Sequence, residues 1–284
     1  MAPIEQQNEW LLRAESMLLE FPRCVSRTDV ASLMEMDIGE SDAVSMLIAG
    51  ILGLDIADNP SHRNLFETMI RPSVEKIDDN RFADNYFLNT IKCTETTNGD
   101  IVLRQMAYAP YELMPCGDLR YGREGRIVAP IGYFDHEWTY PALLENGRIW
   151  MSATPNEIIT MEEPLSRARG EVVVLGLGIG YFAVMAAQKE EVEKVTVIEI
   201  NRRIIDVVES VILPQTDYKS KIDIICGDAL EYMKMGGCAD FLFADIWHDV
   251  GDGLSLYGEL KSSEHLWPGA ECCYWIEPSM KMYL

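Results

Sequence analysis

A glycine-rich turn between a predicted strand and a predicted helix carries the clearest chemical signal in this sequence. Gly176, Gly178 and Gly180 stand at alternate positions after the apolar run Val172–Leu175. Glycine allows the backbone to turn sharply and to approach a ligand closely. Helical spacing begins directly afterwards, in Tyr181–Lys189, so free N–H groups and the positive end of the helix dipole would point at a bound group. The pattern predicts a loop beneath a nucleotide or nucleoside.

Three acidic residues, Glu199, Asp228 and Asp245, each follow an apolar run that predicts a strand. Glu199 comes about 20 residues after the turn, where an acid can accept hydrogen bonds from the two hydroxyls of a ribose. A single acid at a strand end is usually a helix cap. Ligands of open α/β sheets, however, bind outside the carboxyl ends of the strands. Three such acids beside a glycine turn therefore favour a nucleoside site.

The spacing of the glycines distinguishes between nucleoside ligands. The dinucleotide fingerprint G-x-G-x-x-G requires glycine where this chain has Tyr181, which disfavours an NAD-dependent dehydrogenase. The spacing G-x-G-x-G is instead typical of proteins that bind S-adenosylmethionine (SAM). Asp228 can accept a hydrogen bond from the amino group of an adenine, and the small Ala229 leaves room for the ring. A SAM-type nucleoside is the ligand that this order of residues favours.

The order of the elements predicts an α/β fold with a Rossmann-like parallel sheet in residues 165–284. Apolar runs indicate its strands at 172–175, 195–198, 222–226, 239–244 and 271–277. The strand at Ile222–Cys226 is expected to be buried like its neighbours. A helix is expected at Arg202–Val211.

Two other regions precede this sheet. Residues 1–85 have helical periodicity, with helices predicted at Ile4–Leu19, Asp42–Leu52 and Asn64–Ile77. Residues 86–164 form a predicted small β region with two hairpins, whose turns are Asn98-Gly99 and Asn146-Gly147. The expected strands are Tyr86–Thr97, Asp100–Tyr108, Ala142–Glu145 and Arg148–Ala153. We therefore expect three segments: 1–85, 86–164 and 165–284.

Composition narrows the class of partner. The chain has 284 residues, 48% of them hydrophobic, and a formal charge of −22. Nucleic-acid binding requires basic surface, so no nucleic-acid partner is expected. A cationic substrate would suit this charge, although a solvated acidic surface explains it as well. No run of about 18 apolar residues predicts a membrane span. Seven cysteines without a C-x-x-C pair indicate a reduced, cytoplasmic protein, and four scattered histidines predict no metal site.

Residues 171–277 resemble the class I SAM-dependent methyltransferase fold, and most closely its spermidine synthase (aminopropyltransferase) branch. The resemblance lies in VEKVTVIEINRRIIDVVE, GDALEYM, DIWHDVGDGLSLY and LWPGA, and in ENGRIWMSATPNEIITMEE before the glycine loop. It implies a sheet of order 3-2-1-4-5. It also implies that Glu199 holds the ribose, Ile200 packs on the adenine, and Asp228 with Ala229 contacts the adenine edge. The glycine loop, ending at Tyr181, would lie under the methionine portion.

Several positions depart from the aminopropyltransferase pattern. Ile179 replaces the acid between the second and third glycines, and Trp150 or Met151 replaces a glutamine. In the D-S-x-D-P segment, Asp245 is kept, but His248 and Asp249 replace the second aspartate and the proline. The changed positions are those that hold a diamine in that branch. These changes argue against classical polyamine synthesis, whereas SAM-type binding is expected to survive them.

Three functions remain open. The first is a SAM-dependent methyltransferase acting on a small metabolite, for which a cationic one would suit the acidic charge. The second is an aminopropyltransferase-like enzyme that uses decarboxylated SAM, and the third is a SAM-binding protein without turnover. For transfer, Asp245 is the candidate base and His248 a second candidate. Trp247, Tyr257 and Tyr181 are candidate walls of the acceptor site, although all three could be core aromatics.

The sequence ends soon after the fifth predicted strand. Class I methyltransferases continue with an antiparallel hairpin, whereas only Pro278–Leu284 follows Glu277 here. An open sheet edge favours association with another chain. We expect the N-terminal helices or a second copy in a homodimer to cover this edge.

Overall fold

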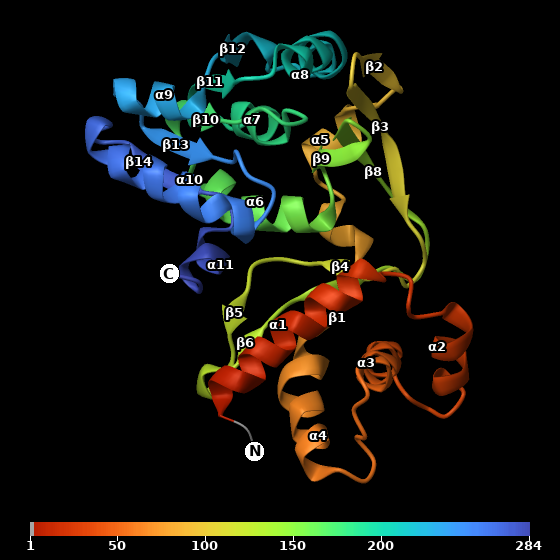
Figure 1. Cartoon of the computed structure of the whole chain (residues 1–284). Helices are drawn as coiled ribbons and strands as arrows, with labels where there is room; N and C mark the ends of the chain where they lie inside the picture. The colour runs from red at the N-terminus through yellow and green to blue at the C-terminus, as the bar shows by residue number, and fades with distance from the viewer. Residues whose placement is uncertain (1–2) are drawn as a thin grey trace. The chain divides into compact units, whose positions relative to one another are not determined.

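The computed structural model describes residues 3–284 and contains two compact units (Figure 1). The smaller unit comprises residues 3–81 with Ala107–Thr139, and the larger unit comprises Phe82–Met106 with Tyr140–Leu284. This division differs from the three expected segments. The predicted β region is split, because residues 107–139 group with the N-terminal helices and the rest groups with the parallel sheet.

The smaller unit is built from helices and short strands. Its helices are α1 (Ile4–Glu20), α2 (Arg27–Met34), α3 (Glu40–Ile51) and α4 (Pro60–Leu65). Its strands are β1 (Val74–Lys76), β4 (Met114–Pro115), β5 (Arg120–Tyr121), β6 (Ile127–Val128) and β7 (Ile131–Tyr133), in sheets of order β1-β7-β4 and β5-β6. Helix α1 buries Leu11, Ala14 and Leu18, as its 3–4 spacing predicts.

The helix predicted at Asn64–Ile77 has different limits. It begins at Pro60, where the side chain of Asn59 accepts hydrogen bonds from the backbone N–H groups of Ser61 and His62. After Leu65 it continues as a π-turn and a short 3₁₀ turn that ends at Ser73. Pro72 cannot continue an α-helix, and the next residues form β1 instead.

An antiparallel sheet of the order β2-β3-β8-β9 contains both predicted hairpins. The first turn is Gly99-Asp100 rather than Asn98-Gly99, because Asn98 pairs with Ile101 in the ladder, whereas the second is Asn146-Gly147 as predicted. Its strands are β2 (Thr96–Asn98), β3 (Ile101–Tyr108), β8 (Trp138–Glu145) and β9 (Arg148–Ser152). Asn146 and Gly147 both have positive φ, 51° and 78°, which is the geometry of a tight two-residue hairpin. The expected strand Tyr86–Thr97 is wrong at its start, because Tyr86–Thr90 forms helix α5 behind an Asn85 cap.

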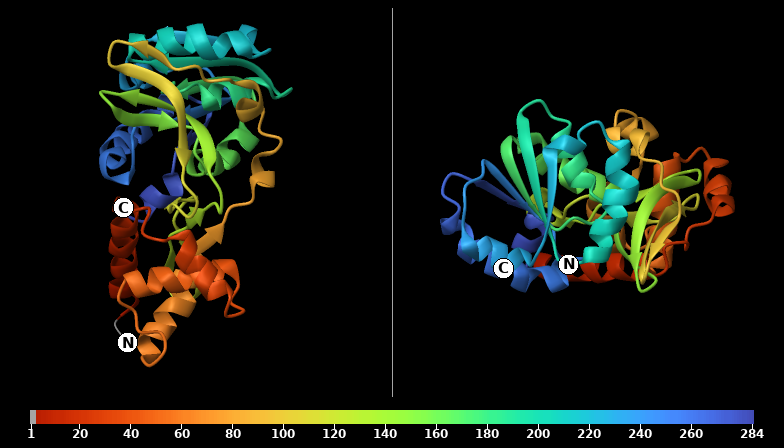
Figure 2. Two further views of the ribbon diagram at one scale, coloured as in Figure 1. Left: turned by 90° about the vertical axis from the view of Figure 1, so that its right-hand side faces the viewer. Right: turned by 90° about the horizontal axis from the view of Figure 1, so that it is seen from above.

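The larger unit contains a five-stranded parallel sheet of the order β12-β11-β10-β13-β14, which confirms the predicted order 3-2-1-4-5. The strands are β10 (Gly170–Leu175), β11 (Val192–Glu199), β12 (Ile222–Cys226), β13 (Phe241–Ala244) and β14 (Glu271–Tyr274). The view from above in Figure 2 shows these strands, green to blue, as a twisted fan. This strand order is that of a Rossmann-like parallel sheet.

Helices connect the parallel strands. They are α6 (Pro155–Arg167) before β10, then α7 (Tyr181–Ala187), α8 (Arg202–Val207), α9 (Ala229–Met235) and α10 (Val250–Ser263). Strand β10 lies at the centre, and Val172–Leu175 are all at most 5% exposed. Strand β12 is not buried on both faces as expected. It is an edge strand, and Ile225 is 43% exposed.

The chain after β14 differs from the predicted long strand. The strand ends at Tyr274, Ile276 has a φ of 49°, and Glu277–Lys281 form helix α11. No further strand follows β14 within residues 3–284. None of the helices described is long and apolar enough to cross a membrane.

Candidate functional site

The carboxyl end of the parallel sheet borders a cavity of about 240 Å³, which we call the main cavity. Its volume lies just below the range of roughly 300–1,000 Å³ that is typical of small-molecule sites. Eight of the ten predicted site residues line it: Gly176, Gly178, Glu199, Ile200, Asp228, Ala229, Asp245 and His248. Other lining residues include Trp150, Met151, Ile198, Leu230, Trp247 and Leu256. The topology thus brings together residues from four strand ends.

The glycine loop approaches its neighbours too closely for any side chain. A Cβ atom on Gly176, whose φ is 96°, would lie 2.0 Å from the carbonyl oxygen of Asp245. On Gly178, whose φ is 51°, it would lie 2.6 Å from Cγ of Met151. Glycine at these two positions therefore keeps the floor of the main cavity open.

Glu199 is buried at the end of β11 and holds the glycine loop. Its Oε2 accepts a hydrogen bond from the N–H of Leu177 at 3.0 Å, and its Oε1 accepts one from the N–H of Asn201 at 2.8 Å. Burial raises the pKa of the carboxyl, and the backbone N–H groups oppose that shift. Each carboxylate oxygen has a second lone pair, so the group can still accept hydrogen bonds from a ribose.

Ile200, Asp228 and Ala229 form a mixed apolar and acidic edge of the main cavity. The side chain of Ile200 is 69% exposed, which leaves an apolar surface for a flat ring to cover. Oδ1 of Asp228 accepts hydrogen bonds from the N–H groups of Leu230 at 2.8 Å and Glu231 at 3.1 Å, so Asp228 caps α9. Its Oδ2 is the oxygen left for an adenine amino group. The cap and the predicted contact are therefore compatible.

Asp245, directly after β13, lies beside Glu157 of α6. Burial raises the pKa of Asp245 to about 7. Burial, with repulsion from Asp245, raises the pKa of Glu157 well above its usual range. Both residues line a second cavity of about 180 Å³, the side cavity. Five residues border both cavities: Trp150, Met151, Asp245, Trp247 and His248. The two cavities therefore adjoin.

Two polar atoms at the side cavity are buried without a hydrogen-bond partner among residues 3–284. They are Oε2 of Glu157, an acceptor, and Nε1 of Trp247, a donor. Trp275, which also lines the side cavity, is different, because its Nε1 donates to Oγ1 of Thr160 at 2.8 Å. An unsatisfied buried polar group costs about 1–3 kcal/mol, so its retention calls for an explanation.

His248 is oriented by two contacts. Its Nδ1 lies 2.9 Å from Oδ2 of Asp252, and its ring meets the ring of Trp150 edge-on, with centroids 4.3 Å apart. Asp252 also accepts hydrogen bonds from the backbone N–H groups of His248 and Asp249. Burial opposes ionisation of Asp252, but these hydrogen bonds prevail and lower its pKa. The carboxylate fixes the imidazole beside both cavities.

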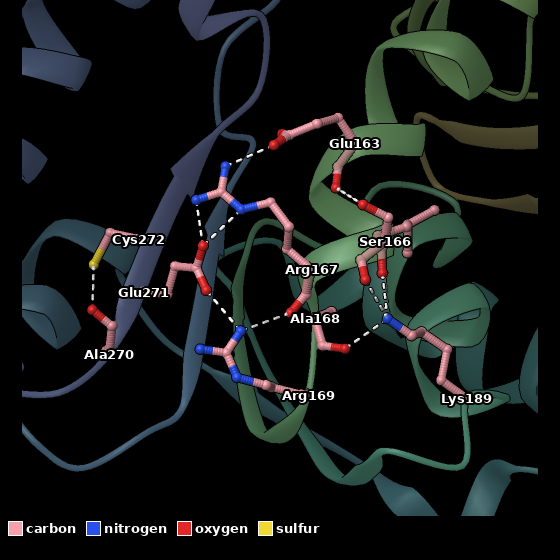
Figure 3. Close-up of polar contacts among 10 residues, drawn as sticks. Glu163, Ser166, Arg167, Ala168, Arg169, Lys189, Ala270, Glu271 and Cys272 are labelled. Carbon is pink, nitrogen blue, oxygen red and sulfur yellow. Dashed lines mark hydrogen bonds and ion pairs between the residues drawn. The ribbon is translucent and has the colours of Figure 1, made fainter.

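Helix α6 positions Glu157, and its C-terminal end is tied to the sheet (Figure 3). Nζ of Lys189 donates three hydrogen bonds, to the carbonyl oxygens of Leu165, Ser166 and Ala168 at 2.6, 3.0 and 2.7 Å. Arg167, in the last turn of α6, pairs with Glu271 of β14. A cation at a helix C-terminus satisfies carbonyls that lack partners within the helix.

Gly180 and Tyr181 do not line the main cavity, although both were expected at the cofactor. A Cβ on Gly180 would face Val208 instead. The hydroxyl of Tyr181 accepts a hydrogen bond from Nδ2 of Asn85 at 2.8 Å, and its ring packs edge-on against Phe87. Tyr257 also lies outside the main and side cavities, and its hydroxyl donates to Oε1 of Glu277 at 2.7 Å. These aromatic side chains serve the core.

Sequence reasoning missed Glu157 and Trp275. Thr154 and Glu157 have the spacing of a capping box, in which the glutamate would bond back to the helix start. The Oγ1 of Thr154 does accept from the N–H of Glu157 at 3.5 Å, but Oε2 of Glu157 makes no return bond. The spacing of Thr154 and Glu157 therefore pointed to Glu157, but as a helix-capping residue and not as a residue of the side cavity. No cluster of three or more metal-ligating side chains is present in residues 3–284.

Comparisons with known proteins give structural similarity only. No protein-family model matches the chain, and no curated protein sequence matches it. A spermidine synthase from Thermotoga maritima is similar at 14% identity over 62% of this chain and 51% of its own, with a TM-score of 0.34. A candidate spermidine synthase from Corynebacterium glutamicum is similar at 15% identity over 38% and 44%, with a TM-score of 0.33.

A candidate SAM-dependent methyltransferase from Streptococcus mutans is similar at 16% identity over 44% of this chain and 35% of its own, with a TM-score of 0.33. The chain spans between 35% and 51% of the length of these three solved structures. Because these TM-scores are low, the assignment of the fold rests on the strand order and on the position of the glycine loop.

Proposed function

We propose that this protein is a SAM-dependent transferase that passes a methyl group to a small, cationic acceptor. The observation that carries the proposal is the main cavity, in which Gly176, Gly178, Glu199 and Asp228 meet at the carboxyl end of the parallel sheet. This is where open α/β sheets bind nucleosides. The residues fit the adenosine part of SAM: an acid for the ribose, an exposed Ile200 for the ring, and a free Asp228 oxygen for the amino group.

SAM, when bound, supplies a methyl group that its sulfonium has already activated for displacement. The protein must then hold a nucleophile in line and remove its proton. Asp245 suits this role because it lies between the two cavities and its pKa of about 7 makes it a base near neutral pH. His248, held by Asp252, is the second group that can accept a proton at this position.

Transfer of an aminopropyl group from decarboxylated SAM is the second candidate. The observation that favours it is the charge of the main cavity, where Glu199, Asp228 and Asp245 contribute three carboxyl groups. Decarboxylated SAM lacks the carboxylate that these groups would repel. Binding without turnover remains the third interpretation.

Calorimetric titration tests the proposal. The protein is titrated with SAM, S-adenosylhomocysteine, decarboxylated SAM and methylthioadenosine. Preference for the first two supports methyl transfer, and preference for the second two supports aminopropyl transfer. Glu199→Gln should weaken binding of the preferred nucleoside about tenfold or more, because it removes a charged acceptor. Glu171→Gln, at the opposite end of the sheet, is the control. A folded protein that binds none of the four nucleosides would refute the proposal.

A further inference from the structure

The side cavity is lined mainly by aromatic and acidic side chains. Three of the six tryptophans in the sequence, Trp150, Trp247 and Trp275, border it together with the carboxyl groups of Glu157 and Asp245. Asp245 also borders the main cavity, whereas Glu157 and Trp275 belong to the side cavity alone. Anything bound among the tryptophans would therefore lie next to the nucleoside site.

The chemistry of these walls selects against most classes of ligand. Negative charge is already unfavourable in this cavity, because burial opposes ionisation of both Glu157 and Asp245, so an anion would not be stabilised there. A hydrocarbon would leave Oε2 of Glu157 and Nε1 of Trp247 buried without a partner, as they are among residues 3–284. An organic ammonium group satisfies the walls, because indole faces attract cations and a carboxylate accepts its N–H bonds.

We infer that the side cavity binds an organic amine in its ammonium form, with Glu157 as the recognising carboxylate. Nε1 of Trp247, which has no hydrogen-bond partner among residues 3–284, can donate to an oxygen atom on the same molecule, so the side cavity should prefer an amine that carries such an oxygen. The occupant is thus a small alkylamine that also carries a hydroxyl or carbonyl oxygen. That this amine is the acceptor of the transferase rests on the proposed function; its binding does not.

Three small molecules of nearly the same shape test this inference by titration into the full chain without any nucleoside. Dimethylaminoethanol has the ammonium and the hydroxyl, dimethylpropylamine has only the ammonium, and isoamyl alcohol has only the hydroxyl. We expect dimethylaminoethanol to bind at least tenfold more tightly than isoamyl alcohol, and more tightly than dimethylpropylamine. Equal binding of the amine and isoamyl alcohol would overturn the inference.

Substitutions at Glu157 and Trp150 test whether the amine binds in the side cavity. Glu157→Gln keeps the shape of the side chain and should weaken binding of dimethylaminoethanol at least tenfold. Glu163→Gln makes the same change on α6 at an exposed side chain outside both cavities, and should leave binding unchanged. Trp150→Leu removes one indole wall and should also weaken binding. Because Trp150 is partly exposed, this variant keeps the experiment informative if Glu157→Gln fails to fold.

If folded Glu157→Gln or Trp150→Leu binds dimethylaminoethanol with the affinity of the wild type, the amine does not bind in the side cavity. These amine titrations contain no SAM, so they test the side cavity even if the protein binds none of the nucleosides. Conversely, a protein that binds SAM but gives equal signals for the amine and isoamyl alcohol would retain the proposed function and lose this inference.

Discussion

Glu157 of α6 and Asp245 at the end of β13 place their carboxyl groups in one side cavity, where burial and Asp245 together raise the pKa of Glu157. Two buried carboxyl groups side by side resist being charged together. A bound cation would relieve that repulsion. The Glu157–Asp245 pair therefore favours a cationic ligand, which is the class of ligand that we infer for the side cavity.

The first prediction concerns pH. Burial raises the pKa of Asp245 to about 7, so the group is mostly protonated below that value and mostly ionised above it. Affinity for dimethylaminoethanol should therefore increase as the pH rises from 6 to 8, because the amine itself stays protonated over this range. Titrations at several pH values measure the trend. An affinity that is flat over this range in the wild type, or that falls, would contradict it.

The second prediction separates chemistry from nucleoside binding. Asp245→Asn should lower the rate of transfer by about 10²-fold or more, because general-base catalysis contributes factors of roughly 10²–10⁴. Binding of the preferred nucleoside should change much less, since Glu199 and the glycine loop are intact. The variant should also lose less stability than the wild type as the pH rises from about 4 to about 7, because it lacks the buried carboxyl group whose pKa is raised to about 7 in the folded protein. A rate within threefold of the wild type would exclude Asp245 as the base.

The third prediction concerns the floor of the main cavity. Gly178→Ala forces a Cβ toward Met151 and a positive φ on alanine, so it should destabilise the protein by about 1 kcal/mol or more and weaken nucleoside binding. Gly258 in α10 is the matched control, because a Cβ there meets nothing within 4 Å. Gly258→Ala should be neutral or stabilising by about 0.5–1 kcal/mol. Thermal unfolding and nucleoside titration measure both effects, and equal behaviour of the two variants would contradict the prediction.

The fourth prediction concerns the anchor of α6. Lys189→Met removes three hydrogen bonds to the carbonyls of Leu165, Ser166 and Ala168, and should cost about 1–3 kcal/mol of stability. Because α6 carries Glu157, affinity for dimethylaminoethanol should fall as well. Lys194→Met, which removes only an exposed pair with Asp223, should cost less than about 1 kcal/mol. Equal stabilities of the two variants, by denaturant titration, would show that the anchor is not needed.

The fifth prediction concerns the smaller unit. Glu15 of α1 borders an apolar pocket with Leu11, Leu18 and Ile48, and burial raises its pKa to about 7 from 4.5. A raised carboxyl pKa contributes stability that is full below about pH 4.5 and is lost as the pH rises to about 7. Glu15→Gln should therefore match the wild type near pH 4 and be more stable by up to about 3 kcal/mol at pH 8. Parallel pH dependences of the two melting temperatures would contradict this assignment.

The sequence predicted the parallel sheet because its signals are local. A buried strand between two helices must be apolar, as Val172–Leu175 are, and a close turn after it must be glycine, as Gly176 is. Strand ends follow directly from these runs, so the spacing of Glu199, Asp228 and Asp245 was enough to assign them to one edge of the sheet. The hairpin turn Asn146-Gly147 was legible for the same reason.

Tertiary contacts decided what local patterns could not. Tyr181 follows the glycine loop in sequence, yet its side chain turns to Asn85 and Phe87, almost a hundred residues away. Glu157 has the spacing of a capping residue, and only the packing of α6 brings its carboxyl beside Asp245. Because the strands are parallel, their carboxyl ends all lie at one edge of the sheet. The order of the strands then decides which of these ends are neighbours. The neighbours of a side chain depend on contacts between distant segments, and no local spacing records those contacts.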